Sequence, residues 1–351
     1  MRSELASIAV ALALAAAGSA PAAADTIRVL NWQGYGTDED WAVKAFEDET
    51  GHTVEHEYFN SEQEMLTKLR TNPGGYDVVL INSAYTPQAA SEGLIQPLDM
   101  SKLKNAPDLI PDLRDNANLM MDGEHYGASW VWGATSFAIN KDKMAPPDTI
   151  EALWADDMEG RIGWRDDAVE SVQLTAIALG QPINAPTDMA AIREKLRALK
   201  PQIRTFWTSE NDWNQYMASG EFDAATYWSG SAARSATNFE LPVEFVIPKE
   251  GAIGWLDGLS LAKDAPNPDA AYAFIDWMIA PEFYVKWDTD IGAPASANGA
   301  AMAALPEGAF NREVLAKAAD EGRLKFMGPI ADDTRKEMLE LWQETKTYFQ
   351  E

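Results

Sequence analysis

The alternation of apolar strands with amphipathic helices near the start of the chain restricts its fold more than any other feature. Residues 26–32 are apolar and β-branched, as in a strand, and residues 39–50 carry their apolar side chains on one helical side. Residues 53–58 and 76–81 are again strand-like, and a helix ending at Arg70 separates them. This order predicts an α/β lobe, a sheet with helices on both faces.

The rest of the chain predicts a second lobe. A second α/β unit, which includes a strand at 224–228, is expected from about residue 132 to about residue 247. Residues 260–279 then indicate a return of the chain to the first lobe. The tail, 333–349, has an amphipathic helical pattern whose apolar stripe comprises Met338, Leu341, Trp342, Thr345, Tyr348 and Phe349. A chain of 351 residues is longer than a single hydrophobic core usually supports. No low-complexity linker separates the units, so we expect two lobes hinged by several crossings.

The N-terminus has the layout of a secretory signal peptide. A short basic start at Arg2 precedes an apolar run over 5–17, and three alanines, 22–24, precede Asp25. A membrane anchor is the alternative, but the run is shorter than the ~20 residues that a span needs. We therefore expect residues 1–24 to be a signal peptide cleaved after Ala24, and the mature protein to be exported to the periplasm.

Charge and cysteine content limit the partners. The chain has no cysteine, which excludes disulfides, thiol chemistry and a lipoprotein anchor. Its net charge of −27 repels nucleic acid and anionic membranes and attracts cations. The same charge also fits simple solubility in a salty habitat, so it supports a cationic ligand only weakly.

Enzyme motifs are absent. The chain has no GxSxG, no P-loop, no HExxH and no GxGxxG. Of its three histidines, His52 and His56 share one face of a strand, but this spacing of about 13 Å is too long for a shared metal. The sequence therefore predicts a protein that is not an enzyme and that has no cofactor and no metal.

Aromatic residues and acids gather at four predicted strand ends or strand-to-helix turns. The segments are 31–35 (NWQGY), 164–170 (WRDDAVE), 227–231 (YWSGS) and 255–258 (WLDG). Ligands of open α/β sheets bind at such ends. Tryptophan and tyrosine faces attract an alkylammonium, and carboxylates accept its hydrogen bonds. Asp167 and Glu170 fit a helix capping box equally well, whereas Trp255 and Asp257 would point the same way from an extended segment.

These segments resemble the periplasmic spermidine/putrescine-binding proteins of ABC importers. The similarity covers almost the whole mature chain, through NWQGY, YDVV, EGLIQPLD, VWGATSFAIN, WRDDAVES, YWSGSAA, PKEGAIGWLDGL and IGAP in the order of that family. It implies the two-lobed periplasmic-binding-protein fold, with crossings near residues 132, 255 and 300. Lobe 1 is then expected to comprise 25–132 plus 255–300, and lobe 2 to comprise 133–254 plus 301–351.

The resemblance also implies a set of ligand-binding residues. Four residues are expected to form the aromatic walls: Trp32, Tyr35, Trp228 and Trp255. Three are expected to supply carboxylates: Asp167, Glu170 and Asp257. Tyr85, next to Ala84, is also expected among the ligand-binding residues. Asp167 would meet a central amine, while Glu170 and Asp257 would hold one terminal ammonium.

This chain departs from the family at the far end of the site. Gly34 stands where an acid is usual, and Ala293 where a tyrosine is common. Asn82 and Ala84 replace a serine and an aromatic residue. These changes leave a shorter diamine, a monoamine or a zwitterion as possible ligands beside spermidine.

The leading hypothesis is a monomeric binding protein that passes a polyamine or related organic cation to the membrane permease of an ABC importer. The alternative within the fold is an amino-acid, betaine or opine binder, for which Arg165 or Arg234 would pair with a carboxylate. A secreted carboxylate-dependent glycoside hydrolase would need two carboxylates roughly 5–9.5 Å apart. A ferric-ion binder would need a cluster of oxygen ligands, often a tyrosine pair, which we do not find.

Overall fold

The computed structural model describes residues 24–350. The strands are β1 (Thr26–Asn31), β2 (Thr53–Tyr58), β3 (Val78–Asn82), β4 (Met120–Met121), β5 (Glu124–His125), β6 (Ala128–Asn140), β7 (Ile162–Arg165), β8 (Ile203–Trp207), β9 (Ala224–Trp228), β10 (Val243–Val246), β11 (Ala252–Leu261), β12 (Ala295–Ser296) and β13 (Leu324–Phe326). The α-helices are α1 (Asp40–Thr50), α2 (Glu62–Thr71), α3 (Thr86–Ser91), α4 (Pro111–Arg114), α5 (Ala168–Ala178), α6 (Met189–Arg197), α7 (Glu210–Ser219), α8 (Ser229–Asn238), α9 (Pro268–Met278), α10 (Pro281–Asp290), α11 (Gly299–Ala304), α12 (Ala316–Asp320) and α13 (Asp332–Gln350).

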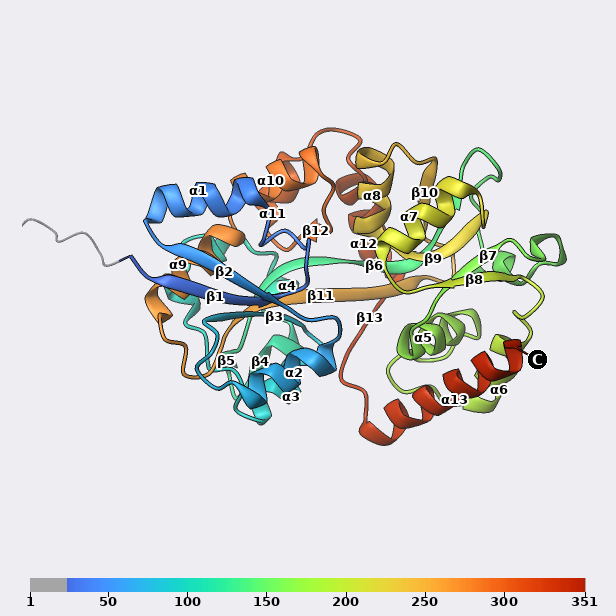
Figure 1. Cartoon of the computed structure of the whole chain (residues 1–351), viewed down its shortest axis with the longest axis horizontal. Coiled ribbons are helices and arrows are strands. Elements are labelled where there is room, and N and C mark those ends of the chain that lie inside the picture. The colour runs from blue at the N-terminus through green and yellow to red at the C-terminus, as the bar shows by residue number, and fades with distance from the viewer. Residues whose placement is uncertain (1–23, 351) are drawn as a thin grey trace, which may run out of the picture.

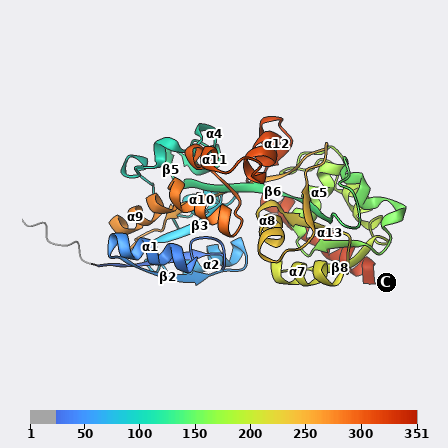
Figure 2. The same ribbon diagram turned by 90° about the horizontal axis from the view of Figure 1, so that it is seen from above.

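Two lobes share one sheet. Its strands follow the order β2-β1-β3-β11-β6-β9-β7-β8, with β10 and β12 added on β6 and β13 on β11. Lobe 1 holds β1 to β3 with α1, α2, α3, α9 and α10, and lobe 2 holds β7 to β9 with α5, α6, α7, α8 and α13 (Figure 1). The antiparallel pair β6 and β11 runs from one lobe into the other (Figure 1), and the view from above shows β6 spanning the space between the lobes (Figure 2). This confirms the predicted two-lobed α/β fold.

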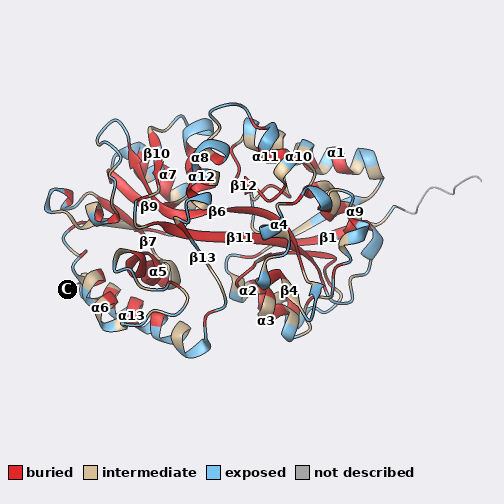
Figure 3. Ribbon diagram, turned by 180° about the vertical axis from the view of Figure 1, so that it is seen from behind, coloured by how far each residue is buried: buried red, intermediate tan, exposed pale blue. Residues whose placement is uncertain are grey.

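Local sequence signals account for the first lobe. Strands β1, β2 and β3 pair in parallel, as their helical crossovers require. Helix α1 ends at Gly51, whose φ of 77° lies in the left-handed region that favours glycine. Helix α2 begins after Ser61, whose side chain accepts a hydrogen bond of 3.2 Å from the Glu64 backbone N–H. The central strands are buried on both faces, whereas the helices are exposed on their outer sides (Figure 3).

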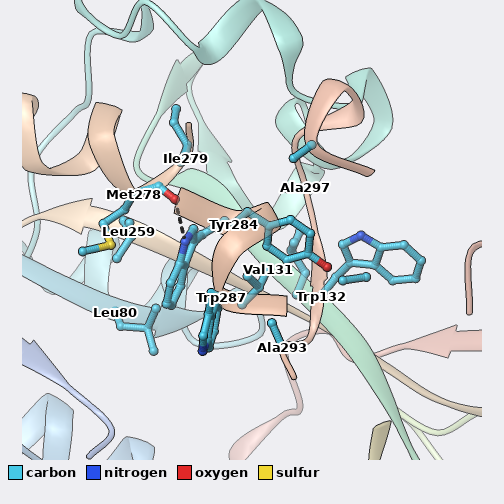
Figure 4. Packing of buried hydrophobic residues seen from close by; sticks show 14 of the residues in the cluster. Leu80, Val131, Trp132, Leu259, Met278, Ile279, Tyr284, Trp287, Ala293 and Ala297 are labelled. Atoms are coloured by element: carbon cyan, nitrogen blue, oxygen red, sulfur yellow. Dashed lines mark hydrogen bonds between the residues drawn. The ribbon is translucent and has the colours of Figure 1, made fainter. Parts of the chain in front are cut away.

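Aromatic side chains fill the core of lobe 1 beside the crossing strands. The indoles of Trp130 and Trp287 stack with centroids 5.5 Å apart, and the Nε1–H of Trp130 donates to the Met278 carbonyl at 3.0 Å. Tyr284 and Trp287 of α10 lie over Val131 and Trp132 of β6 (Figure 4). This packing fixes the lobe 1 half of β6 rigidly against α9 and α10.

Predicted and observed elements agree closely where periodicity is strong. The strands at 53–58 and 224–228 have the predicted bounds, and the tail helix buries four residues of its predicted apolar stripe: Met338, Leu341, Trp342 and Thr345. Two predicted crossings, near 132 and 255, lie within β6 and β11. The residue bounds of the lobes stay a prediction, and the predicted signal peptide lies outside the described residues apart from Ala24. None of the helices in 24–350 is both long and apolar enough to cross a membrane.

Candidate functional site

A row of side chains crosses four strands at the junction of the lobes. Asp257 of β11 pairs with Asn82 of β3, while Trp255 pairs with Gly133 of β6. On the other side of β6, Thr135 pairs with Trp228 of β9. Directly paired residues, and residues two apart on a strand, project from the same face of a sheet. Asn82, Asp257, Trp255 and Trp228 therefore line one face, and the row runs from lobe 1 to lobe 2.

Gly133 makes the centre of this row possible. A Cβ atom at this position would lie 2.3 Å from the Trp255 ring and 2.9 Å from the hydroxyl of Ser229. The Trp255 indole therefore packs directly over the backbone of β6, which only a residue without a side chain permits. The predicted aromatic wall at Trp255 depends on this glycine.

Asp257 lies in a polar cradle on the lobe 1 side. Its Oδ2 accepts a hydrogen bond of 2.9 Å from the Tyr35 hydroxyl, and its Oδ1 accepts one of 2.9 Å from the Asn82 side-chain amide. The residue is only 6% exposed. Burial raises the pKa of Asp257 to about 6, although the hydrogen bonds from Tyr35 and Asn82 act to lower it. Within residues 24–350, no basic side chain forms an ion pair with this carboxylate.

Trp32 and Tyr35 are held at the end of β1 by lobe 1 aromatics. The Trp32 ring packs edge-on against Phe59, with centroids 4.6 Å apart. Tyr35 packs edge-on against Trp130 and Trp287, at 5.8 and 6.2 Å. Both predicted wall residues are half-buried, so each keeps part of its surface accessible.

The predicted lobe 2 residues gather around a basic residue of the protein itself. Nη1 of Arg165 lies 2.5 Å from Oε1 of Glu170 and 3.7 Å from Oδ2 of Asp167. Its guanidinium lies over the Trp228 ring, 4.5 Å from the centroid, and the Trp228 Nε1–H donates to Glu170 at 3.1 Å. Asp167 also caps α5, because its Oδ1 accepts from the Glu170 backbone N–H at 2.9 Å. The capping interpretation of Asp167 is thus correct, and Arg165 already pairs with Glu170.

Tyr85 connects the two sides of the site. It follows β3 in lobe 1, and its hydroxyl accepts a hydrogen bond of 2.6 Å from Nη1 of Arg335 at the start of α13. The Arg335 guanidinium also lies 4.8 Å from the centroid of the Tyr85 ring. Because α13 packs on α5 and α6 of lobe 2, this contact spans the junction.

Three residues that the sequence singled out lie elsewhere. Trp164 is buried in the lobe 2 core, where its Nε1–H donates to Ser171. Asp166 accepts hydrogen bonds from Trp342 and Lys346, which tie α13 to lobe 2. Arg234 forms an ion pair of 2.6 Å with Glu210, so its charge is balanced within lobe 2.

The departures from the family pattern leave two positions without a polar group. Gly34 adopts a φ of 71° and is exposed, while Ala293 is fully buried.

Two further residues, Glu62 and Arg335, approach the row although the sequence pattern did not select them. In the sequence, Glu62 is indistinguishable from an ordinary acid at the start of a capped helix, and Arg335 from any charged residue of an amphipathic tail. Within 24–350, no group of three or more histidine or carboxylate side chains is placed to hold a metal ion.

Comparisons with known proteins identify the family. Residues 41–312 match the bacterial extracellular solute-binding protein family. The chain is 32% identical to the spermidine/putrescine-binding periplasmic protein of Salmonella typhimurium over 92% of both chains. It is 30% identical to the putrescine/agmatine-binding protein of Pseudomonas aeruginosa, over 86% of this chain and 85% of that one.

Solved structures agree with this result. A putative spermidine/putrescine ABC transporter protein from Listeria monocytogenes superimposes with a TM-score of 0.78 at 27% identity, over 92% of this chain and 99% of that one. A spermidine/putrescine substrate-binding protein from Streptococcus pneumoniae, at 23% identity, shares the fold with a TM-score of 0.81 over 93% and 100% of the two chains. The resemblance seen in the sequence is confirmed. The chain belongs to the family of spermidine/putrescine-binding periplasmic proteins, the substrate-binding proteins of ABC transporters.

Proposed function

We propose that this protein captures a small organic cation, in the first place putrescine or another polyamine, and delivers it to the permease of an ABC importer. The observation that carries the proposal is the cradle of Asp257. A carboxylate that is 6% exposed and has no basic partner within 24–350 lacks the countercharge that a buried anion needs. A ligand ammonium supplies that charge.

The surrounding aromatics suit the rest of such a ligand. The Tyr35 hydroxyl donates to Asp257, and Trp255 lies two residues from Asp257 on the same face of β11, while Trp32 follows the end of β1 in the same lobe. Aromatic rings of this kind can cover methylene groups and attract a positive charge. The named ligands of the relatives, spermidine, putrescine and agmatine, are all alkylammonium compounds and support the same assignment. The ligand would bridge the lobes and stabilise the closed state through its higher affinity for that state.

The remaining parts of the proposal follow from this role. Residues 1–24 act as a signal peptide, the mature protein works as a monomer in the periplasm, and it binds no nucleic acid. It has no enzymatic activity. The relatives that match over most of the chain are named as binding proteins, which supports this part of the proposal.

A zwitterionic ligand, such as an amino acid or an opine, is the second candidate. Arg165 favours it, since its guanidinium lies in the site over Trp228 and could receive a carboxylate. Arg335 adds a second positive charge close to Tyr85. In this arrangement the ammonium would lie at Asp257 and the carboxylate at Arg165. A betaine would use the same two ends.

Thermal unfolding of the mature protein with single ligands tests both candidates. Putrescine, spermidine, agmatine, 4-aminobutyrate, a betaine and a neutral sugar form the panel, and Asp257→Asn is the control. A ligand present at 100 times its Kd adds about 2.7 kcal/mol to the free energy of unfolding. Stabilisation by a diamine or polyamine that is lost in Asp257→Asn supports the proposal. Stabilisation by 4-aminobutyrate or the betaine alone moves the assignment to the second candidate, and stabilisation by the sugar alone overturns both.

A further inference from the structure

Glu62 reaches the candidate site from a different element than the family pattern implies. It is the first residue of α2, and its Oε1 accepts a hydrogen bond of 3.4 Å from the Asn82 backbone N–H. The side chain of the same Asn82 donates to Asp257 at 2.9 Å. One residue therefore connects two carboxylates. Oε2 of Glu62 is buried and has no hydrogen-bond partner within 24–350.

These two carboxylates differ in charge balance from the others around the junction. Asp167 and Glu170 have Arg165 within 4 Å, and Glu210 has Arg234. In the part of the chain that the structure describes, neither Glu62 nor Asp257 forms an ion pair with a basic side chain. Burial, followed by the charge of Asp257, raises the pKa of Glu62 well above its usual value.

A purely structural role does not account for Glu62. A carboxylate in the first turn of a helix interacts favourably with the helix dipole, but an exposed side chain achieves this as well. Ser61 already caps α2. Burying Glu62 beside a second carboxylate costs free energy that neither role recovers. A positive group between the two would recover it.

We propose that Glu62 is the second carboxylate of the ammonium site, and that it forms with Asp257 a clamp for one primary ammonium group. This inference rests on the proposed function and specifies its ligand. A primary ammonium has three N–H donors, which two carboxylates can receive while the Tyr35 hydroxyl keeps its own bond to Asp257. A quaternary ammonium has no such donor.

The test compares putrescine, butylammonium and butyltrimethylammonium by titration calorimetry on three variants: Glu62→Gln, Asp257→Asn and Glu64→Gln. Glu64 is the matched control, since it lies on the same helix and its side chain bonds to Asn60 at the exposed end of α2. We expect Glu62→Gln to weaken putrescine and butylammonium roughly 10- to 100-fold and to leave butyltrimethylammonium unbound, as in the unchanged protein. Glu64→Gln should bind like the unchanged protein.

A second readout separates the clamp from simple support of the fold. Burial raises the pKa of both Glu62 and Asp257, and an ammonium bound between them favours their charged forms, so binding should release protons. The heat of binding in buffers of different ionisation enthalpy should therefore show proton release, and Glu62→Gln should reduce it. Folding of each variant is checked by its melting temperature without ligand.

The outcomes distinguish the inference from the function it rests on. If Glu62→Gln binds putrescine within about twofold of the unchanged protein while Asp257→Asn does not, the clamp is wrong and the proposed function stands. If butyltrimethylammonium binds as tightly as butylammonium, the requirement for N–H donors is wrong. If no amine binds the unchanged protein, the proposed function itself fails.

Discussion

The guanidinium of Arg165 lies in contact with Glu170, at 2.5 Å, and over the ring of Trp228, 4.5 Å from its centroid. An aromatic face and a carboxylate are the two groups that a ligand ammonium would use. In lobe 2 a basic side chain of the protein fills these positions. The two ends of the site thus differ: Asp257 lacks a countercharge in the described residues, whereas Glu170 has one.

Removing Arg165 should change the ligand preference. In Arg165→Gln, Glu170 and Trp228 become available to the second ammonium of a diamine, so we expect putrescine and spermidine to bind about tenfold more tightly. A ligand with a carboxylate should bind more weakly, because its partner is lost. Calorimetric titration measures both effects. Arg193→Gln, a change at a surface ion pair with Glu344, serves as control. Unchanged affinity for both ligand types would show that Arg165 lies outside the binding surface.

Asp257→Asn should stabilise the free protein at neutral pH while it abolishes binding. The folded protein holds the Asp257 proton more tightly than the unfolded chain, since the pKa rises from 3.8 to about 6. The contribution of this group to stability is therefore present at low pH and is lost as the pH rises from 3.8 to about 6. Above that range the buried charge costs about 3 kcal/mol, which the substitution removes.

Chemical denaturation at two pH values tests the direction of this change in the free energy of unfolding. The free energy of unfolding of Asp257→Asn should exceed that of the unchanged protein at about pH 7.5 and should match it near pH 4. A variant that is less stable at neutral pH would mean that the hydrogen bonds from Tyr35 and Asn82 outweigh the cost of burying the charge.

Arg335→Ala should weaken ligand binding through the lobe junction. The change removes the hydrogen bond of 2.6 Å to the Tyr85 hydroxyl and the contact with its ring. We expect Kd to increase about three- to tenfold, because the protein loses a contact that joins the lobes. Lys336→Ala, at the exposed neighbouring residue, is the control.

A double-mutant cycle with Tyr85→Phe isolates the pair. If Arg335 acts through Tyr85, the two changes together should cost less than the sum of the single changes. Additive effects would place the role of Arg335 in direct contact with the ligand instead.

Gly133→Ala should destabilise the junction. The added Cβ would lie 2.3 Å from the Trp255 ring, which has to move away from the row of site residues. We expect a loss of about 1–3 kcal/mol in the free energy of unfolding together with weaker binding. Gly299→Ala is the matched control, since the nearest atom to its Cβ would be 3.5 Å away at the start of α11. Equal stability of both variants would contradict the proposed packing.

Local pattern was sufficient to predict several elements and the shared face of Trp255 and Asp257. Strands with strong β-branched or apolar character, such as those at 53–58 and 224–228, have the predicted bounds because their periodicity depends on neighbours in sequence. Trp255 and Asp257 lie on one face of β11 for the same reason, since the side-chain period of a strand is two.

Long-range contacts could not be predicted in this way. The bond from Arg335 to Tyr85 joins residues 250 positions apart, and that from Asn82 to Asp257 joins residues 175 apart. The second depends on the order of strands in the sheet, and the first on the packing of α13 at the junction of the lobes. Glu62 carried no signal either, because acids are common in the first turn of a helix. The contact between Arg165 and Trp228 depends on a side-chain conformation, which sequence spacing does not determine.

The position of β11 has a consequence for how the chain folds. This strand lies between β3 and β6 in the sheet but follows both by more than a hundred residues along the chain. Until residue 261 is available, the sheet consists of two fragments, β2-β1-β3 and β6-β9-β7-β8, that share no hydrogen-bonded edge. Neither fragment has the strand that covers its open edge. Completion of the sheet is therefore a late, non-local step, and the two lobes become native together rather than one after the other during synthesis.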